Sequence, residues 1–430
     1  MKKNYFSFLT AILAFGVQSI FAQNTVTHQV IICSGGDFGN PEDFVTVASY
    51  SIASGQTIVF DTIYTQSVQN VIIENEFAFV AAQDSIVKYD LDTYERIAAV
   101  EASGIHKLAV RDSILVASFW YPETSGFVKT YLSSDLSPVV IFDEVSGEAD
   151  GIFIFPGGLR TVVAVPGGWG STIGKLAWFD METSTFYAEG DMGGYGNGVS
   201  FFATFDTGIP NYVAVTKTPW GDSTFNVYGF TANGEATGVY SYNATMQGYT
   251  GQENTIMYAQ FNDGIGQLDL ENHTIDNNLM IDPPALTIAS SVYDSVNKHF
   301  YVATTDYFST GVGEIYNING QIIGNFDAGI SPEAIAIDYR NNTGIGNLQS
   351  VNKIKIYPNP SSAVITVEVP EGLYSDYFKV ADISGRIIIN ESIRINNRTA
   401  SIDISMLENG LYFLILFNNN EVLTSPFVKK

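Results

Sequence analysis

The sequence repeats one short pattern seven times, and this repeat limits the fold more than any other feature. In each copy a β-rich run contains a small residue, and an apolar residue followed by a polar turn comes after it. The small residues recur every 36 to 50 positions, at Cys33, Ala81, Ala117, Ala164, Ala214, Ala259 and Ala303. The apolar residues are Tyr50, Tyr89, Tyr131, Phe179, Phe230, Leu268 and Tyr316. All-β repeats of this length are typical of β-propeller blades, which must pack around a common axis to bury both sheet faces.

The stretch 77–100 shows the pattern of one copy most clearly. Its residues alternate in three short runs, with turn-forming residues at 83–85 and 90–92 between them. A period of two residues that is interrupted by Asp, Asn, Ser and Gly predicts strand, turn and strand in succession.

The two ends of the repeat region complement each other. The first copy, at Cys33, has no inner strand before it, whereas 331–342 reads as an inner strand with no outer strands after it. Pairing these two ends closes the ring and leaves no open edge there. The sequence therefore predicts an all-β fold: a seven-bladed β-propeller closed by its two ends, followed by a small Ig-like β-sandwich.

Two segments of the repeat region resemble known propellers. The segment GISPEAIAIDYRNN, at 329–342, is similar to the repeats of surface-layer-type (YVTN) β-propellers. The first blade, VIICSGGDFGNPEDF at 30–44, resembles the opening of cell-surface propellers in that group. The resemblance implies the fold and leaves the function open.

The first 22 residues have the pattern of a secretory signal peptide. Lys2 and Lys3 precede an apolar run to Phe21, and Ala22 is a small residue at the expected cleavage position. The alternative is a membrane anchor, but the apolar run is shorter than the ~20 residues that span a bilayer. Cys33 is the only cysteine, so no intrachain disulfide can form, and we expect this side chain to be small and buried.

The remaining segments follow from the repeat and from four motifs near the C-terminus. We expect the propeller at 23–340, a linker at 341–352 and a second domain at 353–430. The motif residues are Tyr357, Pro358, Asn359, Pro360, Gly385, Gly410, Tyr412, Lys429 and Lys430. In this order and spacing they resemble the C-terminal sorting domain of type IX (Por) secretion system cargo, with Glu408 where the family has Pro. The resemblance implies a Gram-negative cell and Sec export to the periplasm. It also implies translocation by the type IX machinery and removal of the domain by a surface peptidase, with release or surface attachment.

Charge is distributed unevenly along the chain. The net charge is −25, yet residues 23–350 contain 10 basic and 37 acidic side chains. Such a surface repels phosphate and anionic polysaccharide over about a Debye length, and we therefore exclude nucleic acid as a partner. The alternative is that the acidic excess only keeps the protein soluble outside the cell.

Aromatic residues gather in the loops between the second and third strands. These loops are short in blades two and six and longer in the other five blades, and repeat proteins often bind ligands through such insertions. The predicted ligand-binding residues are Trp120, Tyr121, Trp169, Trp220, Tyr307 and Phe308. The alternative is that these rings pack on neighbouring blades and hold the loops in place.

The starts of the inner strands should lie on the same face, around the mouth of a central channel. They offer His106, Asp150, Asn197 and Glu333, which could bind a ligand or transfer protons. The alternative is solvated loop ends. The sequence predicts no metal site and no cofactor, because the four His lie in different blades and no catalytic or nucleotide motif occurs.

Three functions remain compatible with these features. The first is a non-enzymatic capture module on the cell surface or outside the cell, whose ligand is a glycan or a macrocycle. Some propellers of the resembling group capture corrinoids for uptake, which would add an outer-membrane receptor as a partner. The second is a hydrolase, lyase or lactonase, which would need His106, Asp150 or Glu333 to converge. The third is a structural surface protein.

Overall fold

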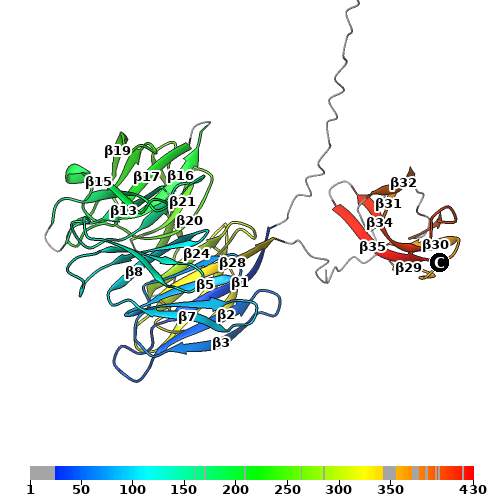
Figure 1. The fold of residues 1–430 in the computed structure, drawn as a ribbon, viewed down its shortest axis with the longest axis horizontal. Helices are drawn as coiled ribbons and strands as arrows, with labels where there is room; N and C mark the ends of the chain where they lie inside the picture. Colours follow the sequence, from blue (N-terminus) through cyan, green and yellow to red (C-terminus); the bar gives the residue numbers. More distant parts are fainter. Residues whose placement is uncertain are drawn as a thin grey trace, which may run out of the picture. The chain divides into compact units, whose positions relative to one another are not determined.

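The protein is described by a computed structural model whose chain divides into two compact units, 1–342 and 343–430 (Figure 1). The described residues are 25–158, 160–168, 171–207, 210–262, 264–283, 286–341, 355–369, 377–382, 386–392, 395, 398–418 and 421–430. The predicted signal peptide at 1–22 and linker residues 342–352 lie outside this part. Each unit is described by itself below.

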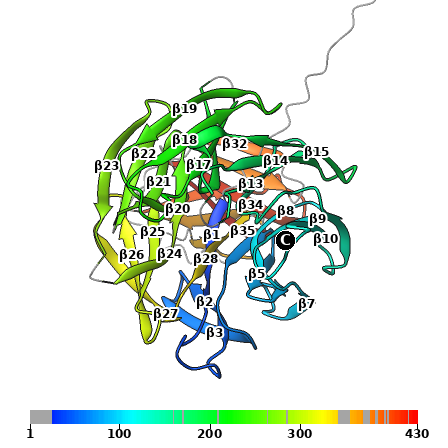
Figure 2. The same cartoon turned by 90° about the vertical axis from the view of Figure 1, so that its left-hand side faces the viewer.

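The described residues of the first unit form seven four-stranded antiparallel sheets. Figure 2 shows these sheets as blades around a ring, with outer strands such as β7, β15, β19 and β23 at its periphery. In chain order of the blades, the inner strands are β28 (Ala334–Asn341), β4 (Asn70–Glu74), β8 (Ile105–Arg111), β12 (Ile152–Ile154), β16 (Val199–Asp206), β20 (Met246–Glu253) and β24 (Thr287–Asp294). The second strands are β1 (Thr25–Ser34), β5 (Phe77–Ala82), β9 (Ile114–Phe119), β13 (Arg160–Val165), β17 (Pro210–Thr216), β21 (Ile256–Phe261) and β25 (His299–Thr305).

The other two strands of each blade complete the sheet toward the rim. The third strands are β2 (Val45–Ser51), β6 (Ser85–Asp90), β10 (Val128–Leu132), β14 (Lys175–Asp180), β18 (Phe225–Phe230), β22 (Gly264–Asp269) and β26 (Thr310–Asn317). The outer strands are β3 (Gln56–Ile63), β7 (Arg96–Glu101), β11 (Pro138–Phe142), β15 (Thr185–Asp191), β19 (Ala236–Tyr242), β23 (Thr274–Ile281) and β27 (Ile322–Ile330). In the part of the chain that the structure describes, one 3-10 turn, η1 (Gly193–Tyr195), lies between blades four and five. Within the described residues, no helix has the length and apolar character that crossing a bilayer requires.

The repeated small residues lie where neighbouring blades touch. All seven of them, from Cys33 to Ala303, are fully buried, and the seven repeated apolar residues are buried as well. The hydrophobic core is divided into clusters, each of which joins two consecutive blades. A small side chain in the second strand lets the next sheet approach closely, which is why the repeat keeps Ala or Cys there. Burial also raises the pKa of the Cys33 thiol, which is therefore inert.

The ring closes through its two ends, as the sequence predicted. Strand β28 pairs with β1 over the whole length of the blade, from Cys33 opposite Ala334 to Thr25 opposite Asn341. The first blade therefore consists of the last strand of the unit and its first three strands. The predicted fold class is confirmed.

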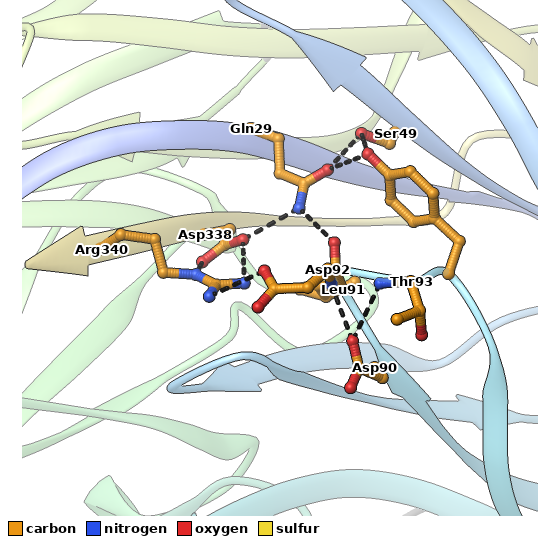
Figure 3. A network of polar contacts seen from close by, with 9 residues as sticks. Gln29, Ser49, Asp90, Leu91, Asp92, Thr93, Asp338 and Arg340 are labelled. Atoms are coloured by element: carbon orange, nitrogen blue, oxygen red, sulfur yellow. Dashed lines mark hydrogen bonds and ion pairs between the residues drawn. The ribbon is translucent and has the colours of Figure 1, made fainter. Parts of the chain in front are cut away.

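A buried polar network holds the closing strand against blade two (Figure 3). Gln29 Nε2 donates to Asp338 Oδ2 at 2.9 Å and to Leu91 O at 3.2 Å. Arg340 pairs with Asp338 and, at 3.1 Å, with Asp92 in the turn after β6. The network lies at the face opposite to the long loops and joins three segments that are far apart in the sequence.

The opposite face, which we call the loop face, is formed by the connections between second and third strands and by the starts of the inner strands. The register places these together, since the start of β4 at Asn70 lies opposite Ala81 at the end of β5. The connections are short in blades two and six, where β6 begins three residues after the end of β5 and β22 three residues after the end of β21, and they are longer in the other five blades. The predicted distribution of long loops is confirmed.

The second unit is a small β-sandwich. One sheet contains β29 (Lys355–Tyr357), β30 (Val364–Glu368) and β33 (Thr399–Asp403). The other contains β32 (Ile387–Ser392), β31 (Tyr377–Asp382), β34 (Gly410–Asn418) and β35 (Glu421–Lys429). Its core includes Ile365, Val380, Leu414 and Phe427, which come from both sheets and are almost inaccessible to water.

Candidate functional site

The inner strands enter the loop face irregularly, and this exposes side chains around the axis. In blades three, five, six and seven the register shifts at the second or third residue of the inner strand, at His106, Ser200, Gln247 and Ala289. A β-bulge redirects a side chain that the regular alternation would send into the sheet packing. The start of the inner strands is therefore where polar side chains reach the channel.

A narrow cavity of about 230 Å³ lies among the inner strands and forms the central channel. Its lining is mostly polar and comes from six of the seven inner-strand segments or their neighbours. Lys107 and Lys217 contribute amines, Glu333 a carboxylate, and Phe201 and Tyr249 aromatic rings. The two rings stack with centroids 6.4 Å apart, and the Lys217 ammonium lies 5.1 Å from the Phe201 ring centroid.

A wider cavity of about 720 Å³ lies on the loop face at the boundary between blades six and seven. Its lining includes Asn262, Asp282, Thr287 and Leu286. The two cavities have Gln247, Gln260 and Ala289 in common, so they adjoin.

Gly248 explains how a second-strand residue reaches the channel. A Cβ at Gly248 would lie only 2.8 Å from the side-chain carbonyl carbon of Gln260. Because Gly248 has no side chain, the Gln260 amide crosses the inner strand and donates to Ser291 Oγ at 3.2 Å. The arrangement puts an amide between the wide cavity and the channel, where it can orient a polar ligand.

His106 and Asp150, two of the predicted channel-mouth residues, contact each other. His106 Nε2 lies 3.1 Å from Asp150 Oδ1, and Asp150 is almost completely buried. Burial lowers the pKa of His106 and outweighs the opposing effect of Asp150, so the imidazole is neutral and donates to the carboxylate. Burial would raise the pKa of Asp150, but the hydrogen bond from His106 and the charges of Lys217 and Lys107 hold it well below its usual value.

Trp120 covers this pair. Its ring stacks on His106 with centroids 4.2 Å apart, and the side chain is half-buried. Gly104 makes the approach possible, since a Cβ there would come within 2.4 Å of the Trp120 carbonyl oxygen. Trp120 thus packs against another side chain at the channel mouth. The sequence analysis gave packing as the alternative to ligand binding for the aromatic loop residues. Tyr121, the next residue, is 81% exposed, and its backbone N–H donates to Glu148.

Asn197 and Trp220 lie beside a third cavity, of about 350 Å³, between blades four and five. Asn197, Asp222 and Pro219 line it, and the Trp220 side chain next to Pro219 is 91% exposed. Trp169 lies outside the described residues. The structure therefore does not bring Trp120 and Trp220 into one common environment.

Tyr307 and Phe308 mark the boundary between blades seven and one. The Phe38 backbone N–H donates to the Tyr307 carbonyl oxygen at 3.3 Å, and a Cβ on Gly39 would touch the Phe308 ring at 3.7 Å. Phe308 is 61% exposed and Tyr307 40% exposed. Both rings are therefore accessible on the loop face while their loop is held against the first blade.

Glu333 lines the channel on the side of blades one and two, apart from the His106–Asp150 pair. It accepts from the Val68 N–H and, at 3.1 Å, from the Ser331 hydroxyl. Burial raises its pKa. An enzyme would need these side chains within hydrogen-bond distance of each other. His106 and Asp150 meet this requirement, but the described contacts do not connect Glu333 to either of them.

Sequence reasoning missed Lys107, Lys217, Tyr249 and the glutamines of the two cavities. Lys107 Nζ donates to Gln69 O at 2.8 Å, and burial lowers its pKa to about 8. Burial also raises the pKa of Tyr249 to about 12. The one available signal was a polar residue directly after a predicted inner-strand start, as in His106-Lys107. Among the described residues, no group of His, Cys, Asp and Glu is arranged to hold a metal ion.

In the second unit, the first and last sorting motifs lie next to each other, although Asn359 and Val428 are 69 positions apart in the sequence. Asn359 accepts from the Val428 N–H at 2.8 Å and donates to Pro426 O at 3.3 Å. Next to it, the Lys430 N–H donates to Ser361 O at 2.9 Å.

The remaining described motif residues lie in or beside the strands at this end of the sandwich, where β34 pairs with β35. Tyr412 stacks on the buried Phe427, and its hydroxyl donates to Glu408 O at 3.0 Å. Tyr357 is in β29, Gly410 begins β34, and Pro358 and Pro360 flank Asn359 in the bend after β29. Lys429 is buried in β35 and Lys430 is exposed, whereas Gly385 lies outside the described residues.

Comparison with protein families identifies this second unit. Residues 355–430 match the secretion system C-terminal sorting domain, and the predicted type IX sorting domain is confirmed. The chain is therefore a type IX-exported protein whose tail addresses it to the cell surface or the extracellular space through the type IX machinery.

Comparison with solved structures supports the fold of the first unit. The β-propeller domain of Cps50 (Swd1) from Myceliophteria thermophila is similar with a TM-score of 0.50 and 9% identity, over 68% of this chain and 99% of that one. PorZ, a surface component of the type IX secretion system of Porphyromonas gingivalis, is similar with a TM-score of 0.47 and 12% identity. The match covers 94% of this chain and 58% of PorZ, so the chain spans little more than half the length of that protein. A search of curated proteins found no match.

Proposed function

We propose that this type IX-exported propeller captures a glycan-type ligand at its loop face without converting it chemically. The observation that carries the proposal is that the 720 Å³ cavity and the central channel adjoin through Gln247, Gln260 and Ala289. The larger recess is lined by three side-chain amides, the Thr287 hydroxyl and the Asp282 carboxylate, beside four apolar residues. A recess of this size and mixed lining suits a polyhydroxylated ligand that both donates and accepts hydrogen bonds.

Exposed aromatic rings on the loop face would add contact area to this recess. Trp220, Tyr307, Phe308 and Tyr121 are accessible, and rigid rings stack on sugar faces at low cost in conformational entropy. Trp169 belongs to the same predicted set. In this proposal Trp120 supports the channel mouth through His106 and does not itself contact the ligand.

A binding screen with a matched pair of variants tests the proposal. The purified protein would be titrated calorimetrically with a panel of neutral and acidic oligosaccharides, and with a corrinoid to represent macrocycles. Ala289→Phe would fill the connection between the two cavities, and we expect it to weaken binding at least about tenfold because the ligand loses the recess. Ala188→Phe, on the outer strand β15, is the control and should bind as the unaltered protein does.

Two results would contradict the proposal. One is the absence of any saccharide that binds. The other is saccharide binding that Ala289→Phe leaves unchanged, which would move the site from the recess to the aromatic rim. Binding of the corrinoid alone would replace the glycan with a macrocycle as the captured ligand, which an outer-membrane receptor could then accept.

The contact between His106 and Asp150 favours a second candidate, a hydrolase, lyase or lactonase at the channel mouth. A carboxylate that orients an imidazole is the usual support for a general base. Against this, Trp120 covers the imidazole by stacking on it. Incubation of each bound ligand with the protein, followed by mass spectrometry, tests this candidate: a product that forms with the unaltered protein and not with His106→Gln would establish catalysis.

A further inference from the structure

The inference concerns two lysines that an acidic propeller keeps at its centre. Residues 23–350 contain 10 Lys and Arg side chains. Within the described part of the chain, Arg96, Lys129, Lys175, Lys298 and Arg340 form ion pairs with carboxylates. Lys88, Arg111 and Arg160 form no such pair with a described carboxylate, and they donate instead to backbone carbonyl oxygens. Lys107 and Lys217 form none either, and these two line the central channel. An ammonium group that is partly removed from water and has no carboxylate partner is costly, so the presence of two such groups in one channel calls for a cause.

The described contacts leave hydrogen-bonding capacity on both ammonium groups. An ammonium group has three donors, and Lys107 uses one of them for Gln69 O at 2.8 Å. The described contact of Lys217 is the cation–π interaction with Phe201. Both amines can therefore donate to a group that enters the channel, and charge-assisted hydrogen bonds are stronger than neutral ones.

The negative groups of the channel are largely engaged elsewhere. Asp150 is held by the hydrogen bond with His106, and Glu333 accepts from the Val68 N–H and the Ser331 hydroxyl. Their fields attenuate the positive charge, but neither lies at ion-pair distance from the two lysines. Tyr249 adds a neutral hydroxyl to the same wall.

We propose that Lys107 and Lys217 form an oxyanion-binding site in the central channel, which takes the carboxylate or sulfate group of an acidic saccharide. The rest of that saccharide would occupy the adjoining 720 Å³ cavity, so this inference rests on the proposed function and specifies its ligand class. The size of the channel agrees with this division. At about 230 Å³ it is smaller than the sites that enclose whole ligands and suits a single charged group with its sugar ring.

The test uses small saccharides of defined charge. Methyl β-D-glucuronide, methyl β-D-glucoside and methyl glucoside 6-sulfate would be titrated into the purified chain at low ionic strength. We expect the charged sugars to bind at least about tenfold more tightly than the neutral one. A preference for the glucuronide or for the 6-sulfate identifies the oxyanion as carboxylate or sulfate, and either preference supports the site.

Matched lysine variants locate the effect. Lys107→Met and Lys217→Met should each weaken binding of the charged sugar about tenfold and leave the neutral sugar unaffected. Lys298→Met, which removes an exposed lysine paired with Glu253, should change neither. Because the loss of a channel lysine can disturb folding, the lysine ¹³Cε resonances of the unaltered protein provide a second measurement. Addition of the glucuronide should shift two of these resonances, and the variants assign them.

The outcomes separate this inference from the proposed function. Equal binding of charged and neutral sugars, or full binding by both lysine variants with no shifted resonance, overturns the oxyanion site. If neutral oligosaccharides still bind and Ala289→Phe still weakens their binding, the proposed function stands without the oxyanion site. If the glucuronide needs both lysines but Ala289→Phe has no effect, the oxyanion site stands and the glycan recess is wrong.

Discussion

Gln29 and Asp338 are 309 residues apart in the sequence, yet the Gln29 amide donates to the Asp338 carboxylate at 2.9 Å (Figure 3). Gln29 belongs to the first strand of the propeller and Asp338 to its last, and Asp338 is completely buried. The pair therefore marks the place where the ring closes. Arg340 extends it to Asp92, so that the closing blade and the next blade share one polar network.

The first prediction tests this closure. Asp338→Ala leaves Gln29 and the Arg340 guanidinium without their buried partner, and we expect it to lower the free energy of unfolding by about 3 kcal/mol. Urea denaturation followed by tryptophan fluorescence measures this loss. Asp327→Ala, on the exposed side of β27, is the control and should unfold as the unaltered protein does. Equal midpoints for the two variants would mean that the network does not stabilise the ring.

The second prediction separates two tryptophans of the loop face. Trp120→Ala removes a half-buried ring from His106 and should lower the free energy of unfolding by about 2 kcal/mol. Trp220→Ala removes a ring that is 91% exposed and should leave stability unchanged while weakening saccharide binding. Thermal unfolding and calorimetric titration of both variants distinguish the two roles. The reverse pattern would make Trp120 the ligand contact and Trp220 the packing residue.

The third prediction is a pH dependence of oxyanion binding. Burial lowers the pKa of Lys107 to about 8, so this lysine loses its charge between pH 7 and 9 and binding of methyl β-D-glucuronide should weaken over that range. His106 is already neutral, Asp150 is charged, and Tyr249, with a pKa of about 12, stays protonated. Glu333 has a raised pKa, so its protonation on the acid side removes a negative charge and strengthens binding. Lys107→Met should remove the dependence between pH 7 and 9.

The titration of Lys107 should also change the free energy of unfolding at alkaline pH. Stability should increase as the pH rises, whereas ligand binding weakens. Its pKa is lower in the folded chain than the ordinary lysine value of about 10.5, so the unfolded chain binds more protons between about pH 8 and 10.5. The contribution of Lys107 to stability therefore increases as the pH rises through this range. Comparison of the unaltered protein with Lys107→Met by urea denaturation at pH 7 and pH 9 isolates this contribution. A larger difference in favour of the unaltered protein at pH 7 would contradict the burial of this amine.

The fourth prediction concerns the sorting domain. Asn359 connects the bend after β29 to β35 through two hydrogen bonds, and Asn359→Ala removes both. We expect the variant to accumulate in the periplasm, because the two sorting motifs are no longer held together. Cell fractionation in a strain with a working type IX system measures this. Asn390→Ala, in β32 of the same sandwich, serves as the control, and equal export of both variants would contradict the role of Asn359.

The fifth prediction is the processing of both chain ends. The mature protein should begin near Gln23 and end before Tyr357, because we expect a signal peptidase to remove the start and a surface peptidase to remove the sorting domain. The intact mass of the secreted protein measures both boundaries. Recovery of secreted chains that still contain Lys430 would contradict the C-terminal cleavage.

The sequence by itself determined the architecture. A small residue at Cys33, Ala81 and the five equivalent positions must be buried between blades, so a count of these residues was a count of blades. Ring closure followed in the same way, because an inner strand at 331–342 without outer strands has a hydrophobic face that only the first blade can cover. The sorting motifs were equally local, since each is a short run of residues in fixed order.

Only the tertiary structure decided which side chains meet around the channel. His106 and Asp150 come from different blades, and the distance between them depends on the tilt of the blades and on a bulge at His106. The lining of the wide cavity comes from three separate segments of blades six and seven, so no local residue pattern predicts it. Lys107 and Lys217 read as ordinary charged residues near strand ends in the sequence. Their environment is set by inner strands that converge on one axis, which is a property of the closed ring and of no single repeat.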